Sequence, residues 1–515
     1  MILRIFSIAC FAVTAAAATC DALAKLALAN TTIVSAATVP KGNFTPPEGK
    51  AFENMPAFCR VVGVLARSGD SHIQFEVWLP TAPDWNKKFQ GVGNGGFAGT
   101  VTYDGLAEAV RHGYATASTD TGHHSRDGID GSWALRHPEK IADFGYRAIH
   151  EMTVAAKSLI NSFYGADARH SYFNSCSNGG RQALMEAQRF PADYDGIVAG
   201  APANYWTHLM TGGAYAEQAL LADPASYISS KKLPAIEEAA VAACDLLDGV
   251  KDGVIDDPRQ CHFDPDVLLC KGAEMDACLT APQIVALKKI YAGPRDSQGH
   301  AIFPGYAIGG QSGMAGWAPW ITGFSAGKSA LFGFSTAFFQ DFVYNDPTWS
   351  VTKFDAERDA KAADDRMASS LNATSPDLKA FQERGGKLIL YHGWDDPAIP
   401  SLNSIDYYNS VVKKMGAKTA ATFVRLYMAP GVQHCIGGPG PDMFGQFSID
   451  AGDADHDVDA AVKRWVEQGV APGPIVARKQ KPVVESRPLC PYPQAEHYKG
   501  SGSIDDAANF TCEAK

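Results

Sequence analysis

The chain has 515 residues, of which 46% are hydrophobic and 20% are charged, and its formal net charge is −11. This length exceeds the size at which one core usually keeps growing, so we expect one large domain with an insertion, or two domains. The composition is typical of a globular protein. The negative charge argues against nucleic acid or an anionic membrane as a partner, because both bind basic surfaces.

The first 18 residues have the features of a signal peptide. A short basic N-terminal region with Arg4 precedes an apolar stretch from Ile5 to Val13, and an alanine run ends near Ala18. The apolar stretch is too short to span a bilayer. We therefore expect a secreted or periplasmic protein.

Ten cysteines remain when the signal peptide, with Cys10, is removed. An even number of cysteines in an exported chain predicts disulfides, and the absence of a Cys-x-x-Cys pair argues against a zinc–thiolate site. Spacing alone leaves the connectivity open. Short spacings favour three pairs, and two more would complete the set: Cys244–Cys261, Cys270–Cys278 and Cys490–Cys512, with Cys20–Cys59 and Cys176–Cys435.

From Cys59 to about Pro202, short apolar runs alternate with helical patterns, which is typical of a mostly parallel sheet covered by helices. Apolar residues at every second position from Ile73 to Leu79 predict a half-buried strand. The other elements predicted here are strands over 88–92 and 171–175 and helices over 144–163 and 180–190.

The residue composition changes between residues 204 and 373, where cysteine- and aspartate-rich loops are followed by glycine- and aromatic-rich stretches. We interpret this segment as an inserted lid domain. The core domain would then comprise residues 19–203 and 374–515, with further strands over 387–391 and 421–427 and a helix over 458–468.

Ser177, Asp396 and His434 occur in the order of the nucleophile, acid and base of an α/β-hydrolase, each just after an apparent strand. A serine hydrolase needs a nucleophile on a sharp turn, an imidazole that takes its proton and a carboxylate that orients the imidazole. The turn resembles Gly-x-Ser-x-Gly, except that Ser175 replaces the first glycine. The fold class predicted is α/β, with an α/β-hydrolase core and a large inserted lid domain.

Other residues could take the place of the acid or the base among these three candidate catalytic residues. Asp395 could orient His434 as well as Asp396 on sequence grounds. His123 and His124 have the right side chain for a base, but they precede the nucleophile and break the chain order. We expect structural roles for these two histidines.

The oxyanion of the reaction requires backbone N–H donors. We expect one from Asn178, directly after Ser177, and a second from Gly95 or Gly96 in the loop after the strand at 88–92. Residues 91–96 also match the dinucleotide pattern Gly-x-Gly-x-x-Gly, but no clear helix follows, so we expect no organic cofactor.

Residues 245–256 place aspartates every few positions around glycines. Calcium takes six to eight oxygen ligands, including backbone carbonyls, so the pattern fits either a calcium site or a solvated acidic turn. Farther on, ten aromatic residues could form the lid core or line a pocket for a flat substrate. They are Trp317, Trp320, Phe324, Phe332, Phe334, Phe338, Phe339, Phe342, Tyr344 and Trp349.

Several motifs are spread over nearly the whole mature chain. They comprise residues 56–61, 93–99, 118–123, the serine turn with 180–183, His392-Gly393 with Asp396, and His434-Cys435. Together these motifs resemble the tannase and feruloyl esterase family, which includes mono(hydroxyethyl) terephthalate hydrolase.

The resemblance implies the roles of specific residues. It assigns Ser177, Asp396 and His434 as the triad and Cys176–Cys435 as a disulfide beside it. It also implies a structural Ca²⁺ in the lid. The implied ligands are Asp245, Asp248, Asp252 and the carbonyls of Val250 and Val254.

The implied function is that of a secreted serine esterase that cleaves esters of hydroxycinnamic, gallic or terephthalic-type acids through an acyl-enzyme. An acyl transferase with the same triad, or an esterase similar to mono(hydroxyethyl) terephthalate hydrolase, remains an alternative. A non-catalytic binding protein would not need all three triad residues. The expected partner is a small aromatic ester, and the expected state is a monomer or weak homo-oligomer.

Overall fold

The computed structural model describes residues 18–449, 452–479 and 484–514. Residues 1–17 of the predicted signal peptide lie outside these ranges. No helix within the described ranges combines the length and the apolar character needed to cross a membrane.

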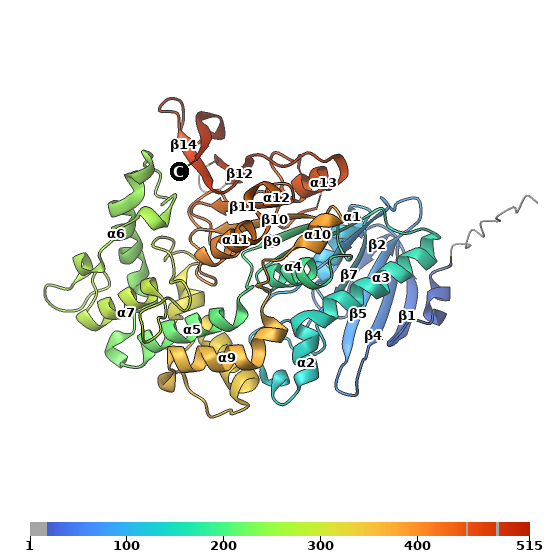
Figure 1. The fold of residues 1–515 in the computed structure, drawn as a ribbon, viewed down its shortest axis with the longest axis horizontal. Coiled ribbons are helices and arrows are strands. Elements are labelled where there is room, and N and C mark those ends of the chain that lie inside the picture. The colour runs from blue at the N-terminus through green and yellow to red at the C-terminus, as the bar shows by residue number, and fades with distance from the viewer. Residues whose placement is uncertain (1–17, 450–451, 480–483, 515) are drawn as a thin grey trace, which may run out of the picture.

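A nine-stranded sheet forms the centre of the molecule (Figure 1). Its first strands pair in antiparallel fashion and the strands from β7 to β11 are parallel. In spatial order the strands are β1 (Thr31–Val39), β4 (Phe58–Leu65), β5 (Ile73–Pro80), β7 (Ala115–Thr119), β6 (Lys88–Gly91), β8 (His170–Cys176), β9 (Gly196–Gly200), β10 (Lys387–Gly393) and β11 (Val424–Ala429).

Helices cover both faces of this sheet. Alternate residues of a strand point to opposite faces, so Leu388 and Leu390 pack in one core while Ile389 packs in another. The first face carries α3 (Ala148–Tyr164), α4 (Asn178–Arg189) and α11 (Leu402–Met415), and the second carries α1 (Tyr103–Arg111) and α13 (Val458–Gln468). The structure therefore has the layers of an α/β-hydrolase.

The segment between β9 and β10 contributes helices but no strand to the sheet. These helices form separate apolar cores and lie to the left of the sheet in Figure 1. The longer ones are α5 (Trp206–Leu221), α6 (Leu233–Cys244), α7 (Ala281–Ala292), α8 (Ala330–Ala337) and α9 (Ala356–Leu371). Whether residues 204–373 act as a lid stays a prediction.

Short elements complete the fold. They are the helices α2 (Pro138–Ala142), α10 (Lys379–Glu383) and α12 (Ala417–Ala420), and the strand pairs β2 (Gly42–Phe44) with β3 (Phe52–Met55), β12 (Ile475–Lys479) with β13 (Glu485–Leu489) and β14 (Gln494–Tyr498) with β15 (Phe510–Ala514).

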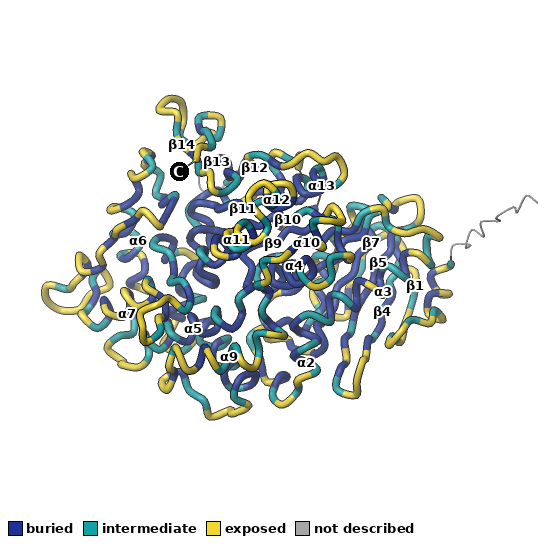
Figure 2. Tube along the Cα trace, in the orientation of Figure 1, coloured by how far each residue is buried: buried dark blue, intermediate teal, exposed yellow. Residues whose placement is uncertain are grey.

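Two local predictions differ from the structure. The strand at Ile73 is buried on both faces rather than one, because β4 and β7 flank it and helices cover the sheet (Figure 2). Its fully buried Glu76 is paired with Arg60 and accepts a hydrogen bond from the Trp78 indole at 2.8 Å. The helix predicted from residue 144 begins with a π-helical turn over Asp143–Arg147, and α3 follows it.

Candidate functional site

Ser177 occupies the sharp turn between β8 and α4. Its backbone φ of 66° and ψ of −126° lie in a region that residues with a side chain rarely adopt. The hydrogen bond from Ser177 N–H to the Gly200 carbonyl, 2.9 Å long, ties the turn to the end of β9. Strained conformations of this kind are concentrated at functional sites.

Close packing around the turn explains why its glycines are needed. A Cβ on Gly179 would overlap Ser175 Oγ and lie 2.6 Å from Ser175 Cβ, and one on Gly180 would overlap the Gly200 carbonyl. Ser175 therefore fits at the position of the usual glycine because residue 179 has no side chain.

His434 and Asp396 meet beyond the ends of β11 and β10. His434 Nδ1 donates to Asp396 Oδ2 at 2.8 Å, which leaves Nε2 free to accept a proton. Asp396 Oδ1 accepts the backbone N–H groups of Ala398 and Ile399 at 2.8 and 2.9 Å. The carboxylate is therefore fixed by its own turn and oriented toward the imidazole.

A second histidine, His392, supports the same carboxylate. Its Nε2 lies 3.1 Å from Asp396 Oδ2 and 3.0 Å from the Ile399 carbonyl, so this nitrogen carries the proton. Nδ1 then accepts from the Ser404 hydroxyl at 2.7 Å. The sequence pattern placed His392 within a motif but indicated no role for its side chain.

The electrostatics distinguish the two adjacent aspartates. Burial by itself would raise the pKa of Asp396, but the charge and hydrogen bonds of His434 and His392 outweigh it and hold the pKa well below its usual range. Burial raises the pKa of Asp395, which lies against Gly309 and Gly310 instead of His434. Of the two, only Asp396 hydrogen bonds to the imidazole.

All five predicted cysteine pairs are disulfides in the structure. Cys176–Cys435 joins residues 259 positions apart, with their Cα atoms 6.2 Å from each other. Because these cysteines directly adjoin Ser177 and His434, the bond holds the two turns together.

Replacing both Cys176 and Cys435 with alanine is expected to lower kcat/KM by up to about 10²-fold, because small displacements of catalytic groups are costly. Activity should be lost at temperatures where circular dichroism still shows a folded protein. The matched control removes Cys490–Cys512, which closes the C-terminal tail, and should leave kcat/KM nearly unchanged. Outright unfolding of the Cys176–Cys435 variant would contradict a local role.

Ser177 and His434 line one cavity of about 940 Å³. The two side chains form no hydrogen bond with each other within the described structure, and such contacts often tighten only when substrate binds. Gly95 and Gly96 line the same cavity, and Asn178 is the first residue of α4, where N–H groups lack helical partners. Gly95 and Gly96 thus line the cavity of Ser177, and the N–H group of Asn178 directly follows Ser177 in the chain.

Comparisons with known proteins identify the family of this chain. The family model described as tannase and feruloyl esterase matches residues 59–513. An uncharacterised esterase of Xanthomonas campestris pv. campestris is 43% identical, covering 96% of this chain and 91% of its own length. The chain belongs to the tannase and feruloyl esterase family.

Two further proteins are similar to this chain. Mono(2-hydroxyethyl) terephthalate hydrolase of Piscinibacter sakaiensis is 34% identical, with 89% of this chain and 85% of that protein covered. The crystal structure of feruloyl esterase B from Aspergillus oryzae has a TM-score of 0.88 and 31% identity, with 96% of this chain and 99% of that chain covered. The protein is therefore a carboxylic ester hydrolase with an α/β-hydrolase fold.

The role of Arg181 in this esterase was not predicted from the sequence. The guanidinium is fully buried one turn after Ser177 and donates to Asn178 Oδ1 at 2.8 Å and to the Phe144 carbonyl at 3.1 Å. It also lies 5.0 Å from the centre of the Trp206 ring. Burial lowers the pKa of Arg181 to about 9, so it remains a cation at neutral pH and anchors the first turn of α4.

Most of the predicted lid aromatics are core residues. Of the ten, Trp320 lines the cavity, and its ring meets the His434 ring edge to face with centroids 4.9 Å apart. Phe324 is 75% exposed. Phe52 and Phe447 also line the cavity, but they come from outside the predicted lid and no sequence pattern pointed to them.

His123 is buried and stacks on Trp133, with ring centroids 3.7 Å apart. Burial lowers its pKa to about 4. This residue packs between elements and does not line the cavity with Ser177. His124 is exposed and lies 3.7 Å from Glu48.

The aspartate-rich segment after α6 folds into a closed loop. Asp245 Oδ1 accepts the N–H groups of Asp252 and Gly253 at 3.2 and 3.0 Å. Burial, followed by the nearby carboxylates of Glu496 and Asp248, raises the pKa of Asp256. Carboxylates crowded in this way provide hard oxygen ligands whose repulsion a cation would relieve.

Proposed function

We propose that this esterase acts through a serine nucleophile and an acyl-enzyme, with Ser177, His434 and Asp396 as the triad. The observation that carries the proposal is that His434, which is hydrogen bonded to the buried Asp396, lines the same cavity as the strained Ser177 turn. His434 Nε2 takes the proton as Ser177 Oγ attacks the ester carbonyl. Asp396 holds Nδ1–H and stabilises the imidazolium.

The remaining steps use the same groups. Backbone N–H groups of Asn178 and of Gly95 or Gly96 stabilise the oxyanion. His434 passes its proton to the leaving alcohol as the acyl-enzyme forms. Water then attacks the acyl-enzyme and gives a proton to His434, and His434 returns this proton to Ser177 Oγ as the acid is released.

The substrate class we propose is esters of aromatic acids. Trp320 supports it, because its indole lies beside His434 and offers a flat apolar wall at the point of reaction. The names of two relatives indicate feruloyl esters and mono(hydroxyethyl) terephthalate as their substrates. Both substrates are esters of an aromatic acid. Methyl ferulate, methyl gallate and mono(hydroxyethyl) terephthalate are therefore the panel that tests the proposal.

We expect kcat/KM to be higher for at least one of these three esters than for ethyl butyrate. Trp320→Ala should raise KM for the preferred aromatic ester about tenfold, because a ring contact is lost, and should change KM for ethyl butyrate little. Phe324→Ala is the matched control, since Phe324 is exposed and does not line the cavity. Equal losses on both ester classes would show that Trp320 acts on His434 rather than on the substrate.

We also propose a structural Ca²⁺ at the aspartate-rich loop. Asp245, Asp248, Asp252 and the carbonyls of Val250 and Val254 would hold it, with Asp256 and Glu496 close by. Asp252 is also paired with Arg487 at 2.6 Å. When bound, calcium would offset the repulsion among these carboxylates and brace the loop without taking part in the chemistry.

Calcium removal should lower Tm by roughly 2–3 °C when the ion had been present at a hundredfold excess over its Kd. Calorimetry with and without chelator checks this, with kcat measured well below Tm expected to stay within twofold. Asp248→Asn should reduce the response, whereas the exposed Asp276→Asn should not. An unchanged melting curve together with no calcium by elemental analysis would remove the proposal.

Export is the last part of the proposed function. Five disulfides are typical of proteins that fold in an oxidising compartment, outside the cytosol. We propose that residues 1–18 direct the chain there as a signal peptide.

A further inference from the structure

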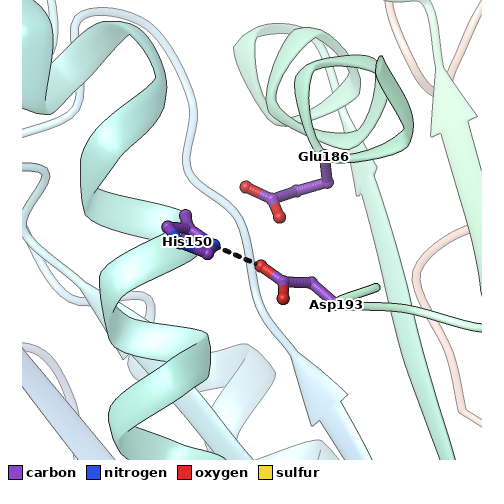
Figure 3. A group of neighbouring side chains, drawn as sticks. All are labelled: His150, Glu186 and Asp193. Carbon is purple, nitrogen blue, oxygen red and sulfur yellow. Dashed lines mark hydrogen bonds and ion pairs between the residues drawn. The ribbon is translucent and has the colours of Figure 1, made fainter. Parts of the chain in front are cut away.

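Three side chains that could bind a metal meet away from the catalytic cavity (Figure 3). His150 comes from α3, Glu186 from α4 and Asp193 from the loop between α4 and β9. One ligand atom of each lies within 4.8 Å of the others. Figure 3 shows the Glu186 carboxylate directed toward the space between the other two side chains.

Glu186 has no hydrogen-bonding partner for its charge among the described residues. The residue is 1% exposed, and neither carboxylate oxygen accepts a hydrogen bond from them. Lys157, whose charge acts on Glu186, donates its Nζ instead to the carbonyls of Ala192 and Asp193. Burying a carboxylate without a partner is costly, so the folded protein requires a proton or a cation at this point.

The surroundings of Glu186 make a neutralising proton or cation still more necessary. Burial, followed by the adjacent Asp193 carboxyl, raises the pKa of Glu186 well above its usual value. Asp193 is 7% exposed, so water does little to separate the two charges. Either the two carboxyl groups share a proton or a cation lies between them.

His150 favours the cation. Its Nδ1 lies 2.6 Å from Asp193 Oδ2, and its ring is held by stacking on Phe190 with centroids 3.8 Å apart. An imidazole nitrogen beside two carboxylates is a donor set that suits Zn²⁺, whereas Ca²⁺ and Mg²⁺ prefer oxygen alone. His150 is half-buried, so an ion can reach the cluster from solvent.

We propose that His150, Glu186 and Asp193 bind one Zn²⁺. The ion would replace the proton between His150 and Asp193, neutralise Glu186 and complete its coordination with water. It would join α3 to α4. Glu186 follows Ser177 by nine residues on α4, about 13 Å along the helix, so the site would stabilise the helix that begins at the proposed nucleophile without contacting substrate.

The test uses the full chain, stripped with a chelator and then saturated with Ca²⁺ so that the loop after α6 is not a variable. Zn²⁺ is added, unbound metal is removed, and bound zinc is counted by elemental analysis while Tm is measured. Wild type should retain one more zinc per chain than His150→Asn or Glu186→Gln. Zinc at a hundredfold excess over Kd should raise the wild-type Tm by roughly 2–3 °C and leave both variants unchanged.

His208→Asn is the matched control. His208 forms a comparable contact with Asp364, 2.9 Å long, but no third ligand joins that pair in the described part of the chain. This variant should keep the zinc and the rise in Tm. Equal zinc content in wild type and both cluster variants would overturn the proposal. So would an unchanged wild-type Tm combined with a more stable Glu186→Gln, which would show a shared proton instead.

Discussion

Ser177→Ala is expected to lower kcat on the preferred aromatic ester by on the order of 10⁴-fold or more, since Ser177 is the proposed nucleophile that forms the acyl-enzyme. Tm should stay within about 1 °C of wild type, because the hydroxyl makes no hydrogen bond that supports the fold in the described structure. Initial rates and a thermal scan of the same preparation check both outcomes.

Ser175→Ala provides the matched control for this loss. Ser175 lies two residues before Ser177, and its side chain also lines the cavity. This variant should keep kcat within a few-fold of wild type. A Ser177→Ala protein that retains a tenth or more of the wild-type rate would show that another group is the nucleophile.

Gly179→Ala should disturb the Ser177 turn. The new Cβ would overlap Ser175 Oγ and approach Ser175 Cβ, and neither the strand nor the helix can move without displacing Ser177. Overpacking of this kind costs about 1–3 kcal/mol of unfolding free energy. A displaced nucleophile should lower kcat/KM by about 10²-fold.

The chain also offers a rescue that tests this mechanism. Ser175→Gly removes the atoms that the new Cβ would meet, so the double variant Ser175→Gly/Gly179→Ala should recover most of the activity lost by Gly179→Ala. Ser175→Gly alone should cost about 0.5–1 kcal/mol from backbone entropy and little activity. If the double variant is as impaired as Gly179→Ala, the Asn94 carbonyl, 3.3 Å from the position of the new methyl group, is the obstacle.

Much of the architecture around the candidate site follows from local sequence. The strand and helix on either side of Ser177 and the strands before Asp396 and His434 are predictable to within a few residues. These elements have strong apolar periodicity or lie beside glycine-rich turns, which depend mainly on residues close in the chain. Parallel strands then place their carboxyl ends at one edge of the sheet.

Contacts between segments that are far apart in the chain could not be predicted as well from the sequence. The same local pattern allowed Asp395 or Asp396, and only the direction of the turn after β10 places Asp396 against His434 and Asp395 against the glycines at 309–310. Glu496 comes near Asp256 because the C-terminal strands pack beside the loop after α6. No spacing in the sequence encodes that approach.

The sequence by itself therefore determined the chemistry that is available: the order of Ser177, Asp396 and His434 and the cysteines beside two of them. Tertiary structure alone decided which aromatic residues border the cavity, which acids surround the loop after α6, and that His150, Glu186 and Asp193 form a cluster. The physical reason is that periodicity sets which face a side chain takes on its own helix or strand. What lies opposite that face depends on how separate elements pack, and packing joins residues at any distance along the chain.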